Sequence, residues 1–418
     1  MKKVFIKFVS LIVGLTFIFS LSACSFVEEF MHVHDYIGKN DEQSHWLECS
    51  CGEIKDKENH IWGEGVTTLE PTVESFGERS FSCSCGVIKK EEIPKLLTDK
   101  LQIHFLTLGN DYAGDCIYVK AGDTDILIDG GSRANSVDDI TSYVDKYVTD
   151  GTLEYVVVTH ADQDHIACFG IIDGSLFDYY ECEVIIDFPL SDKTTKVYER
   201  YQKERADEVE KGARHFTALE CYEGTKEGAQ PKYQLADDIS MEILYNHYYE
   251  NKSSHENNYS VCLQFVHGTR KFIFTGDLEE DGEQYLVQKN ELGQVELYKA
   301  GHHGSKTSSS DALLDVIKPK ICVVTCSSGT DEYTKIEENQ FPTQAFIDRI
   351  SKHTDKVYVT TLGDNDFTNG KEFIDMNGNI VILSLEKDIE VICSNNSTLL
   401  KDTDWFKNDR NCPKNWLD

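Results

Sequence analysis

The stretch Thr159-His160-Ala161-Asp162-Gln163-Asp164-His165 decides how the rest of the chain is interpreted. It comes at the end of the apolar segment 155–159, so we expect it to form the loop that leaves a buried strand. Two histidines and two aspartates fall within six residues, and a turn lets alternate side chains face one point. Imidazole and carboxylate together suit zinc, manganese or iron. The stretch therefore predicts a metal site, and a plain polar loop is the less favoured interpretation.

Two later segments also combine an apolar run with potential metal ligands at its end. Phe272 to Thr275 is an apolar run that leads through Gly276 to Asp277, and Leu297 to Ala300 leads through Gly301 to the pair His302-His303. Strand ends that share one edge of a sheet are where a rigid scaffold assembles a site. We therefore expect these side chains to join the first group.

The pattern between about 101 and 395 mixes strands with helices, which predicts an α/β layered class. Short β-branched runs bounded by Gly and Asp are typical of buried strands. Helices are expected at 136–148, 193–214, 280–289, 309–317 and 343–352, and a closing hairpin with Asn377-Gly378 at its turn is expected over 377–392.

In this order, the motifs resemble those of the metallo-β-lactamase superfamily, and within it the hydrolase domain of the competence protein ComEC and its free-standing relatives. The resemblance covers Leu101 to Ile392 and implies a four-layer αββα sandwich, here placed at 101–395 with a tail at 396–418. Its motifs are Gly114-Asp115, Ile126 to Gly131, the 160–165 stretch, Thr275 to Asp277 and His302 to Lys306.

The resemblance also implies two divalent metal ions, zinc or manganese. His160 and Asp162 would bind the first. Asp164, His165 and one histidine of the 302/303 pair would bind the second, and Asp277 would bridge the two. We expect His302, the nearer to the strand end, to be the ligand and His303 to orient a ligand or face the substrate. Asp129 looks like the buried carboxylate that orients a ligand histidine.

The chain departs from the superfamily pattern at the first metal. Asp162 stands where the family more often has histidine, and the usual further histidine has no clear counterpart among His215, His247 and His255. Asn257 to Ser260 resembles the ComEC pattern instead. An oxygen-rich first site would favour Mn²⁺ over Zn²⁺.

The resemblance implies hydrolysis by a metal-activated water, with Asp164 or Asp277 accepting its proton. Ser305 and Lys306 are placed to hold a phosphate oxygen, which favours a phosphodiester such as DNA or RNA. They could equally cap a helix that starts near Ser308. Hydrolysis of an ester, lactone or β-lactam on the same site, or a surface binding protein without catalysis, are the alternatives.

The net charge of −32 bears on the substrate. A negative field repels nucleic acid and anionic lipid at long range, so a nucleic-acid substrate has to be held locally by metal ions and a few lysines. A smaller phosphodiester avoids this repulsion.

The first residues predict an exported, membrane-anchored protein. Lys2-Lys3, an apolar run over 8–19 and Leu21-Ser22-Ala23-Cys24 form a signal peptide over 1–23. The last four residues resemble a bacterial lipobox, which implies lipidation of Cys24 and a tether over 24–33. We therefore expect an extracytoplasmic lipoprotein.

Residues 34–94 contain an internal repeat. Cys49-Ser50-Cys51-Gly52 recurs as Cys83-Ser84-Cys85-Gly86, and each copy follows a His-x-aromatic start, at His34 and at His60. Two tandem modules follow from this pattern. A structural zinc held by the four cysteines, with His34 or His60 competing, is preferred to disulfides. The repeats resemble cysteine-histidine modules of Gram-positive surface proteins. This resemblance implies that they act as a spacer or in adhesion.

Overall fold

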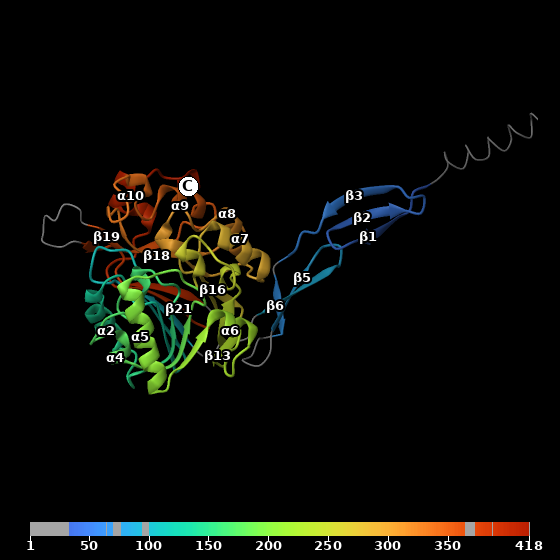
Figure 1. Cartoon of the computed structure of the whole chain (residues 1–418). Helices are drawn as coiled ribbons and strands as arrows, with labels where there is room; N and C mark the ends of the chain where they lie inside the picture. The colour runs from blue at the N-terminus through green and yellow to red at the C-terminus, as the bar shows by residue number, and fades with distance from the viewer. Residues whose placement is uncertain are drawn as a thin grey trace, which may run out of the picture. The chain divides into compact units, whose positions relative to one another are not determined.

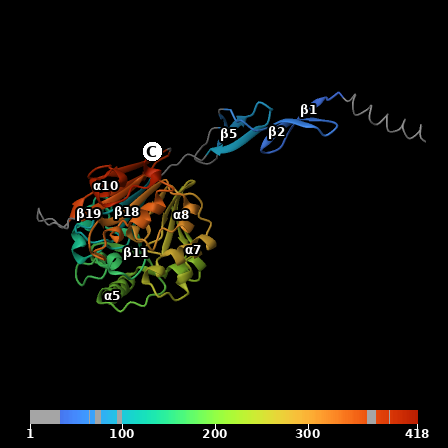
Figure 2. The same ribbon diagram turned by 90° about the horizontal axis from the view of Figure 1, so that it is seen from above.

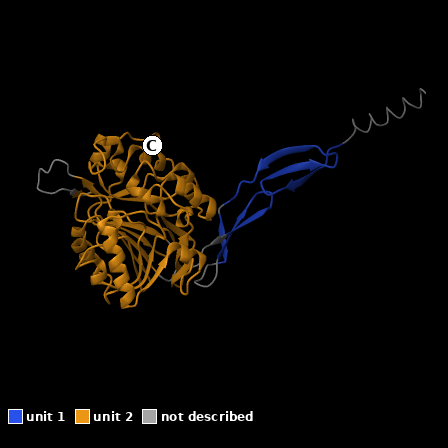
Figure 3. Ribbon diagram, viewed as in Figure 1, with its two compact units in different colours: residues 1–95 blue, residues 96–418 orange. Residues whose placement is uncertain are grey.

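The computed structural model describes residues 33–63, 65–69, 77–93, 100–363, 373–386 and 388–417. The chain forms two compact units, residues 1–95 and 96–418, which are coloured separately in Figure 3. The expected signal peptide, the lipidation site Cys24 and nearly all of the tether lie outside the described residues. Within the described part of the chain, no helix combines the length and the apolar character that a bilayer span requires.

The first unit contains two three-stranded antiparallel sheets, one for each copy of the repeat. Each Cys-Ser-Cys-Gly sequence lies in the turn between the second and third strand of its sheet. Gly52 and Gly86 both have φ of 90°, a conformation that glycine adopts without strain. The strands are β1 Tyr36–Asn40, β2 Ser44–Cys49 and β3 Ile54–Asn59, then β4 Val66–Leu69, β5 Gly77–Ser82 and β6 Ile88–Ile93.

The four repeat cysteines do not surround one point, and in this respect the expectation of a single four-cysteine zinc site was wrong. Each turn holds its own pair of cysteines, so the pairs belong to different hairpins. Cys49 and Cys51 lie with His34, whereas Cys83 and Cys85 lie with His60 and a further histidine, His45.

The second unit is built from two eight-stranded sheets. One sheet has the order β12-β11-β10-β9-β8-β7-β21-β22, and the other has the order β13-β14-β15-β16-β17-β18-β19-β20. The first contains β7 Leu101–Phe105, β8 Ile117–Ala121, β9 Thr124–Ile128, β10 Thr152–Val157, β11 Glu181–Asp187, β12 Arg214–Thr217, β21 Ile380–Ser384 and β22 Ile389–Cys393. The second contains β13 Lys232–Ala236, β14 Ile239–Leu244, β15 Cys262–His267, β16 Arg270–Phe274, β17 Leu297–Lys299, β18 Ile321–Ser328, β19 Val357–Gly363 and β20 Phe373–Asp375.

Helices cover the outer faces of both sheets. In Figure 1, α2, α4 and α5 lie on one side of the strands and α7, α8 and α9 on the other, and Figure 2 shows β11 between α5 and β18. This arrangement confirms the αββα sandwich. The helices are α2 Val137–Val144, α3 Gln163–Ile166, α4 Leu176–Tyr179, α5 Lys196–Lys211, α6 Ala218–Glu223, α7 Glu280–Lys289, α8 Asp311–Ile317, α9 Gln344–Ile350 and α10 Asp404–Asp409.

Aromatic side chains fill the space between the sheets. The rings of Phe105 and Phe274 stack across it with centroids 6.2 Å apart, and Phe265 meets Phe274 edge to face. All eight residues of β18 are buried, because helices cover one face of this strand and the other sheet covers its opposite face.

The strand directions bring the site residues together. Strands β9 to β12 run parallel in one sheet, and β16 to β19 run parallel in the other. Asp129, His160, Asp277 and the His302-His303 pair follow the carboxyl ends of β9, β10, β16 and β17. Ends of parallel strands are a common location for sites in α/β proteins.

The C-terminal part of the chain differs from two expectations. Asn377-Gly378 precedes β21, and the β21–β22 hairpin is closed by the bond from Leu385 N–H to the Asp388 carbonyl. Asn377 is instead buried, and its Oδ1 accepts from Val359 N–H at 2.7 Å. Residues 396–417 are no loose tail, because Leu400, Phe406 and Trp416 are buried in the core under the second sheet.

Candidate metal centre

The loop after β10 turns its histidines inward. His160 and His165 are fully buried, and their ring centroids lie 4.1 Å apart. Asp162 precedes the short helix α3, whose first turn is closed by the bond from His165 N–H to the Asp162 carbonyl. This turn places Asp164 and His165 on one side and leaves Asp162 partly exposed.

Four side chains from three loops converge on one point. They are Asp164, His165, Asp277 and His303, and their potential ligand atoms all lie within 4.8 Å of one another. Oδ2 of Asp277 is central, at 3.3 Å from Nε2 of both His165 and His303. Oδ2 of Asp164 lies 3.4 Å from Nε2 of His303. We call these four residues the carboxylate–histidine cluster.

The outer nitrogen of each cluster histidine is held by a buried acceptor. Nδ1 of His165 lies 2.7 Å from Oδ2 of Asp129, and Nδ1 of His303 lies 2.8 Å from the Thr325 carbonyl. A carbonyl only accepts, so Nδ1 of His303 carries the proton and donates it. With Nδ1 protonated, Nε2 is the nitrogen of each ring that faces the cluster and would bind a metal.

The cluster fits a divalent cation. Among the described buried side-chain atoms, Nε2 of His165 and His303 in the cluster, and Nε2 of His160 beside it, have no hydrogen-bond partner. Buried polar atoms are nearly always satisfied, so several unsatisfied ones facing each other indicate a bound group. Imidazole nitrogens with carboxylate oxygens suit Zn²⁺ or Mn²⁺.

The charges around the cluster follow from burial and close contact. Burial would lower the pKa of His165 and of His303, but Asp277 and the carboxylates behind the rings raise both well above the ordinary value. Burial would raise the pKa of Asp277, yet the cluster histidines and Lys299 hold it well below its usual range. Without metal the cluster thus holds protons on the histidines, and metal binding would release them.

Two residues of this centre were given no role from the sequence, although Asp115 belongs to the Gly114-Asp115 motif. Asp115 and Lys299 are both buried and form an ion pair behind the cluster. Lys299 Nζ also lies 3.5 Å from Oδ1 of Asp277, and Asp115 accepts from the hydroxyl of Thr325. A lysine inside a buried strand requires a carboxylate partner, so Leu297-Tyr298-Lys299 did contain a signal.

The structure reverses the order expected for the histidine pair. His303 is fully buried in the cluster, whereas the side chain of His302 is 20% exposed and its Nε2 lies 4.0 Å from Asp277. Both residues have left-handed backbone, with φ of 47° and 54°. This turn sends the second histidine of the pair inward, which proximity to the strand end does not reveal.

The ligands expected for the first metal form a less complete set than the carboxylate–histidine cluster. His160 Nε2 lies 3.6 Å from Oδ2 of Asp162, and Oδ1 of Asp162 pairs with Lys193. Burial lowers the pKa of His160 to about 4, so its ring is neutral and able to bind a cation. The three mid-chain histidines lie elsewhere: His215 binds Asp187 at 2.8 Å, His247 stacks on Tyr285, and His255 is 61% exposed beside Glu279.

Ser305 is buried, and Lys306 after it is exposed. Lys306 is exposed and donates to Oδ1 of Asn339 at 3.2 Å, outside the cluster. The alternative of a helix cap at Ser305 and Lys306 was wrong, because α8 begins at Asp311 and Ser310 caps it. Tyr333, which is exposed, donates to Oδ2 of Asp164 at 3.0 Å.

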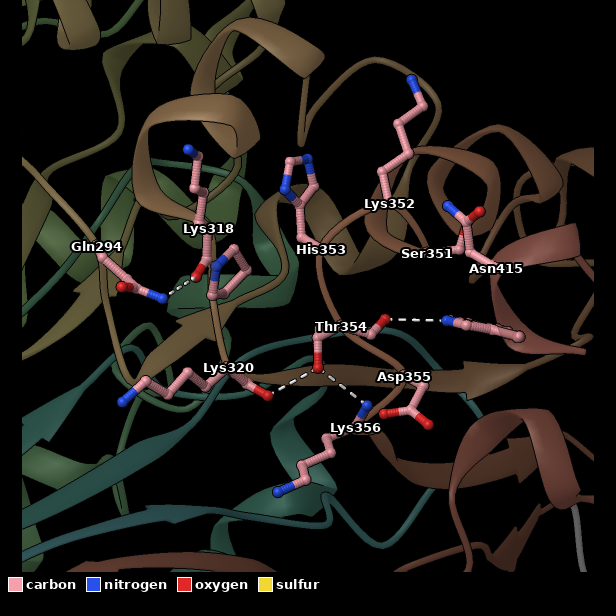
Figure 4. Close-up of a pocket in the computed structure, with 12 residues that line it drawn as sticks. Gln294, Lys318, Lys320, Ser351, Lys352, His353, Thr354, Asp355, Lys356 and Asn415 are labelled. Carbon is pink, nitrogen blue, oxygen red and sulfur yellow. Dashed lines mark hydrogen bonds between the residues drawn. The ribbon is translucent and has the colours of Figure 1, made fainter. Parts of the chain in front are cut away.

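A hollow lies away from the metal centre. It has a volume of about 860 Å³, and Lys318, Lys320, Lys352 and Lys356 are among its lining residues (Figure 4). In its wall, the hydroxyl of Thr354 donates a hydrogen bond to the Lys320 carbonyl and accepts one from Lys356 N–H. The residues around 320 and 356 precede β18 and β19, so the hollow is at the strand edge opposite the cluster.

Known proteins share this domain. The family model described as the metallo-β-lactamase superfamily matches residues 109–241 and 253–326. Competence protein ComA of Neisseria gonorrhoeae is 36% identical over 146 residues, which cover 34% of this chain and 19% of that protein. ComE operon protein 3 of Bacillus subtilis is 26% identical over 214 residues, which cover 50% of this chain and 23% of that protein. The chain thus spans less than a quarter of either relative.

A solved structure is among those to which the chain is similar. A metallo-β-lactamase from Cronobacter sakazakii with a HARLDQ motif is 12% identical, with a TM-score of 0.28. The match covers 46% of this chain and 72% of that one. A likeness of this degree carries no information on substrate.

Proposed function

Because the chain belongs to the metallo-β-lactamase superfamily, in the subgroup of the competence proteins, we propose that it is a metal-dependent phosphodiesterase. The observation that carries the proposal is the set of buried ligand atoms facing one another without hydrogen-bond partners within the described residues. Such an arrangement costs stability unless a cation satisfies it. Two ions, Zn²⁺ or Mn²⁺, would be bound by the carboxylate–histidine cluster and by His160 with Asp162.

The cations would supply an activated water and stabilise charge on the attacking and leaving oxygens. The protein side chains perform the remaining tasks. Asp129 and the Thr325 carbonyl fix the tautomers of His165 and His303. Asp164 or Asp277 would accept the proton of the water, and the exposed Lys306 would hold a phosphate oxygen.

DNA is the first substrate to test, because one of the relatives is named as a competence protein. The charge of −32 opposes long polyanions, so short or single-stranded substrates should be favoured at low salt. Divalent cations and salt should reduce this preference.

The test is hydrolysis of bis(p-nitrophenyl) phosphate beside single- and double-stranded DNA. Metal-stripped full-length protein would receive Mn²⁺ or Zn²⁺, with Asp164→Ala as the site variant and the exposed Asp348→Ala as its control. We expect metal-dependent turnover that Asp164→Ala abolishes and Asp348→Ala preserves. Absence of turnover with two metals bound would favour an ester, lactone or β-lactam substrate, and absence of metal binding would favour a surface binding protein.

A further inference from the structure

The first unit contains a second group of metal-ligand types. His45, His60, Cys83 and Cys85 each offer one ligand atom, and these four atoms lie within 4.8 Å of one another. Cys83 and Cys85 carry free thiols. The carboxylate–histidine cluster of the second unit contains no sulfur ligand, so the two centres differ in chemistry.

The repeat explains how three of the four ligands come together. In the first copy Tyr36 pairs with Cys49 across the sheet, and in the second copy Trp62 pairs with Cys83. Each pairing sets the histidine two residues earlier, His34 or His60, beside the Cys-x-Cys turn of its own copy. Sγ of Cys85 lies 3.4 Å from Nδ1 of His60, and the same distance separates Cys51 from His34.

The fourth ligand comes from the other repeat. His45 is on β2 of the first copy, and its Nδ1 lies 3.9 Å from Sγ of Cys83. The corresponding position of the second copy, four residues before its first cysteine, is Arg79, which cannot bind a metal. Within the described residues, only the group at Cys83 and Cys85 receives such a cross-repeat histidine.

A further bond orients one of the imidazoles. Nε2 of His60 lies 2.9 Å from the Asp41 carbonyl, to which it donates its proton. Nδ1 is then the nitrogen that the neutral ring offers to a metal, and it faces Cys85. A backbone carbonyl that fixes the ligand tautomer is a common feature of histidine metal sites.

We propose that His45, His60, Cys83 and Cys85 bind one structural zinc ion that ties the first repeat to the second. A tetrahedral site with two sulfur and two nitrogen ligands is a usual structural zinc site. Zn–S bonds of about 2.3 Å and Zn–N bonds of about 2.0 Å separate nitrogen from sulfur by roughly 3.5 Å. The observed separations of 3.4 and 3.9 Å agree with this geometry.

Cobalt(II) added to the full-length, metal-stripped chain tests the assignment. The absorption from thiolate-to-cobalt charge transfer would report the thiol sites alone, because the carboxylate–histidine cluster offers only nitrogen and oxygen ligands. We expect His45→Ala to weaken the tightest thiolate-bound ion at least about tenfold, since even removal of an orienting partner costs 10–100-fold. Arg79→Ala is the matched control, and His34→Ala should remove only the weaker, three-ligand group.

Alkylation mapped by mass spectrometry gives a second measurement that does not depend on the stability of the variants. Bound Zn²⁺ should protect Cys83 and Cys85 in the native chain, and a chelator should expose both. The proposal is overturned if these cysteines form a disulfide, if zinc does not protect them, or if His45→Ala binds cobalt as tightly as Arg79→Ala.

Discussion

Nδ1 of His165 lies 2.7 Å from Oδ2 of Asp129, and neither side chain is exposed to solvent. The same carboxylate accepts from the N–H and the hydroxyl of Thr159, the residue before the first candidate ligand. Asp129 therefore joins the ends of β9 and β10 and fixes one cluster histidine. Positioning residues of this kind determine how well a metal site is preorganised.

The substitution Asp129→Asn should weaken metal binding without removing a ligand. An amide cannot hold the Nδ1 proton of His165 as a carboxylate does, so the ring would lose its fixed tautomer. We expect a 10–100-fold loss of affinity at the cluster, measured by metal titration. Asp187→Asn is the matched control, because Asp187 forms a buried pair with His215 instead. Equal losses in both variants would indicate a general effect on folding.

The histidine pair gives a second prediction. His303→Ala should abolish stoichiometric metal binding at the cluster, with a loss of at least about hundredfold, because a ligand matters more than its orienting partner. His302→Ala should leave the metal content unchanged, since His302 is outside the four-residue group. Metal analysis of the two purified variants after dialysis checks this. Loss of metal from His302→Ala alone would restore the order expected from the sequence.

Several parts of this structure could be predicted from the sequence because they depend on local pattern. Each metal motif follows an apolar strand, and parallel strands end at one edge, so the convergence of Asp164, His165 and Asp277 was foreseeable. The choice between His302 and His303 depends on two left-handed residues that no periodicity encodes. Glycines flank the pair, but they do not reveal which histidine turns inward.

Other contacts depend on tertiary pairing. His45 completes a group with Cys83, 38 positions away, and Asp115 meets Lys299 across almost half of the chain. Spacing within one motif cannot show such partners. Two signals were available. A lysine in a buried strand indicates a carboxylate partner, because a buried charge needs one. The difference between the repeats, histidine in one and arginine in the other, marks His45 as unusual.

The buried imidazole of His104 should make stability depend on pH. Burial lowers its pKa to about 4 from an ordinary value of 6.5, so the unfolded chain binds more protons between these two pH values. Stability from this group is present above pH 6.5 and is lost as the pH falls toward 4, by on the order of 3 kcal/mol.

The variant His104→Asn should therefore flatten the unfolding free energy between pH 6.5 and 4, relative to the parent. Asparagine can keep the bond to the Tyr143 hydroxyl, which lies 2.9 Å from Nδ1 of His104. His255→Asn is the control, because that side chain is 61% exposed. Parallel pH curves for the parent and His104→Asn would contradict the assignment.

The C-terminal segment should contribute to the stability of the second unit. Trp416 is buried, packs on Phe406 and donates to the Thr354 carbonyl at 2.9 Å. Trp416→Ala should cost about 3–5 kcal/mol in the free energy of unfolding. Denaturant titration beside Leu417→Ala, whose side chain is 68% exposed in the parent, measures this. Equal stabilities would mean that the segment behaves as a tail.

Lys193 should compete with the first metal ion. Its ammonium group pairs with Oδ1 of Asp162, which is the oxygen-bearing ligand expected beside His160. The neutral variant Lys193→Met should free this carboxylate and tighten the weaker of two metal-binding steps severalfold, while the cluster step stays unchanged. Lys196→Met, at an exposed position where α5 begins, is the matched control. Calorimetric titration of metal-stripped protein resolves the two steps. If Lys193→Met leaves both steps unchanged but raises the KM for a phosphodiester, the lysine holds substrate and does not compete with metal.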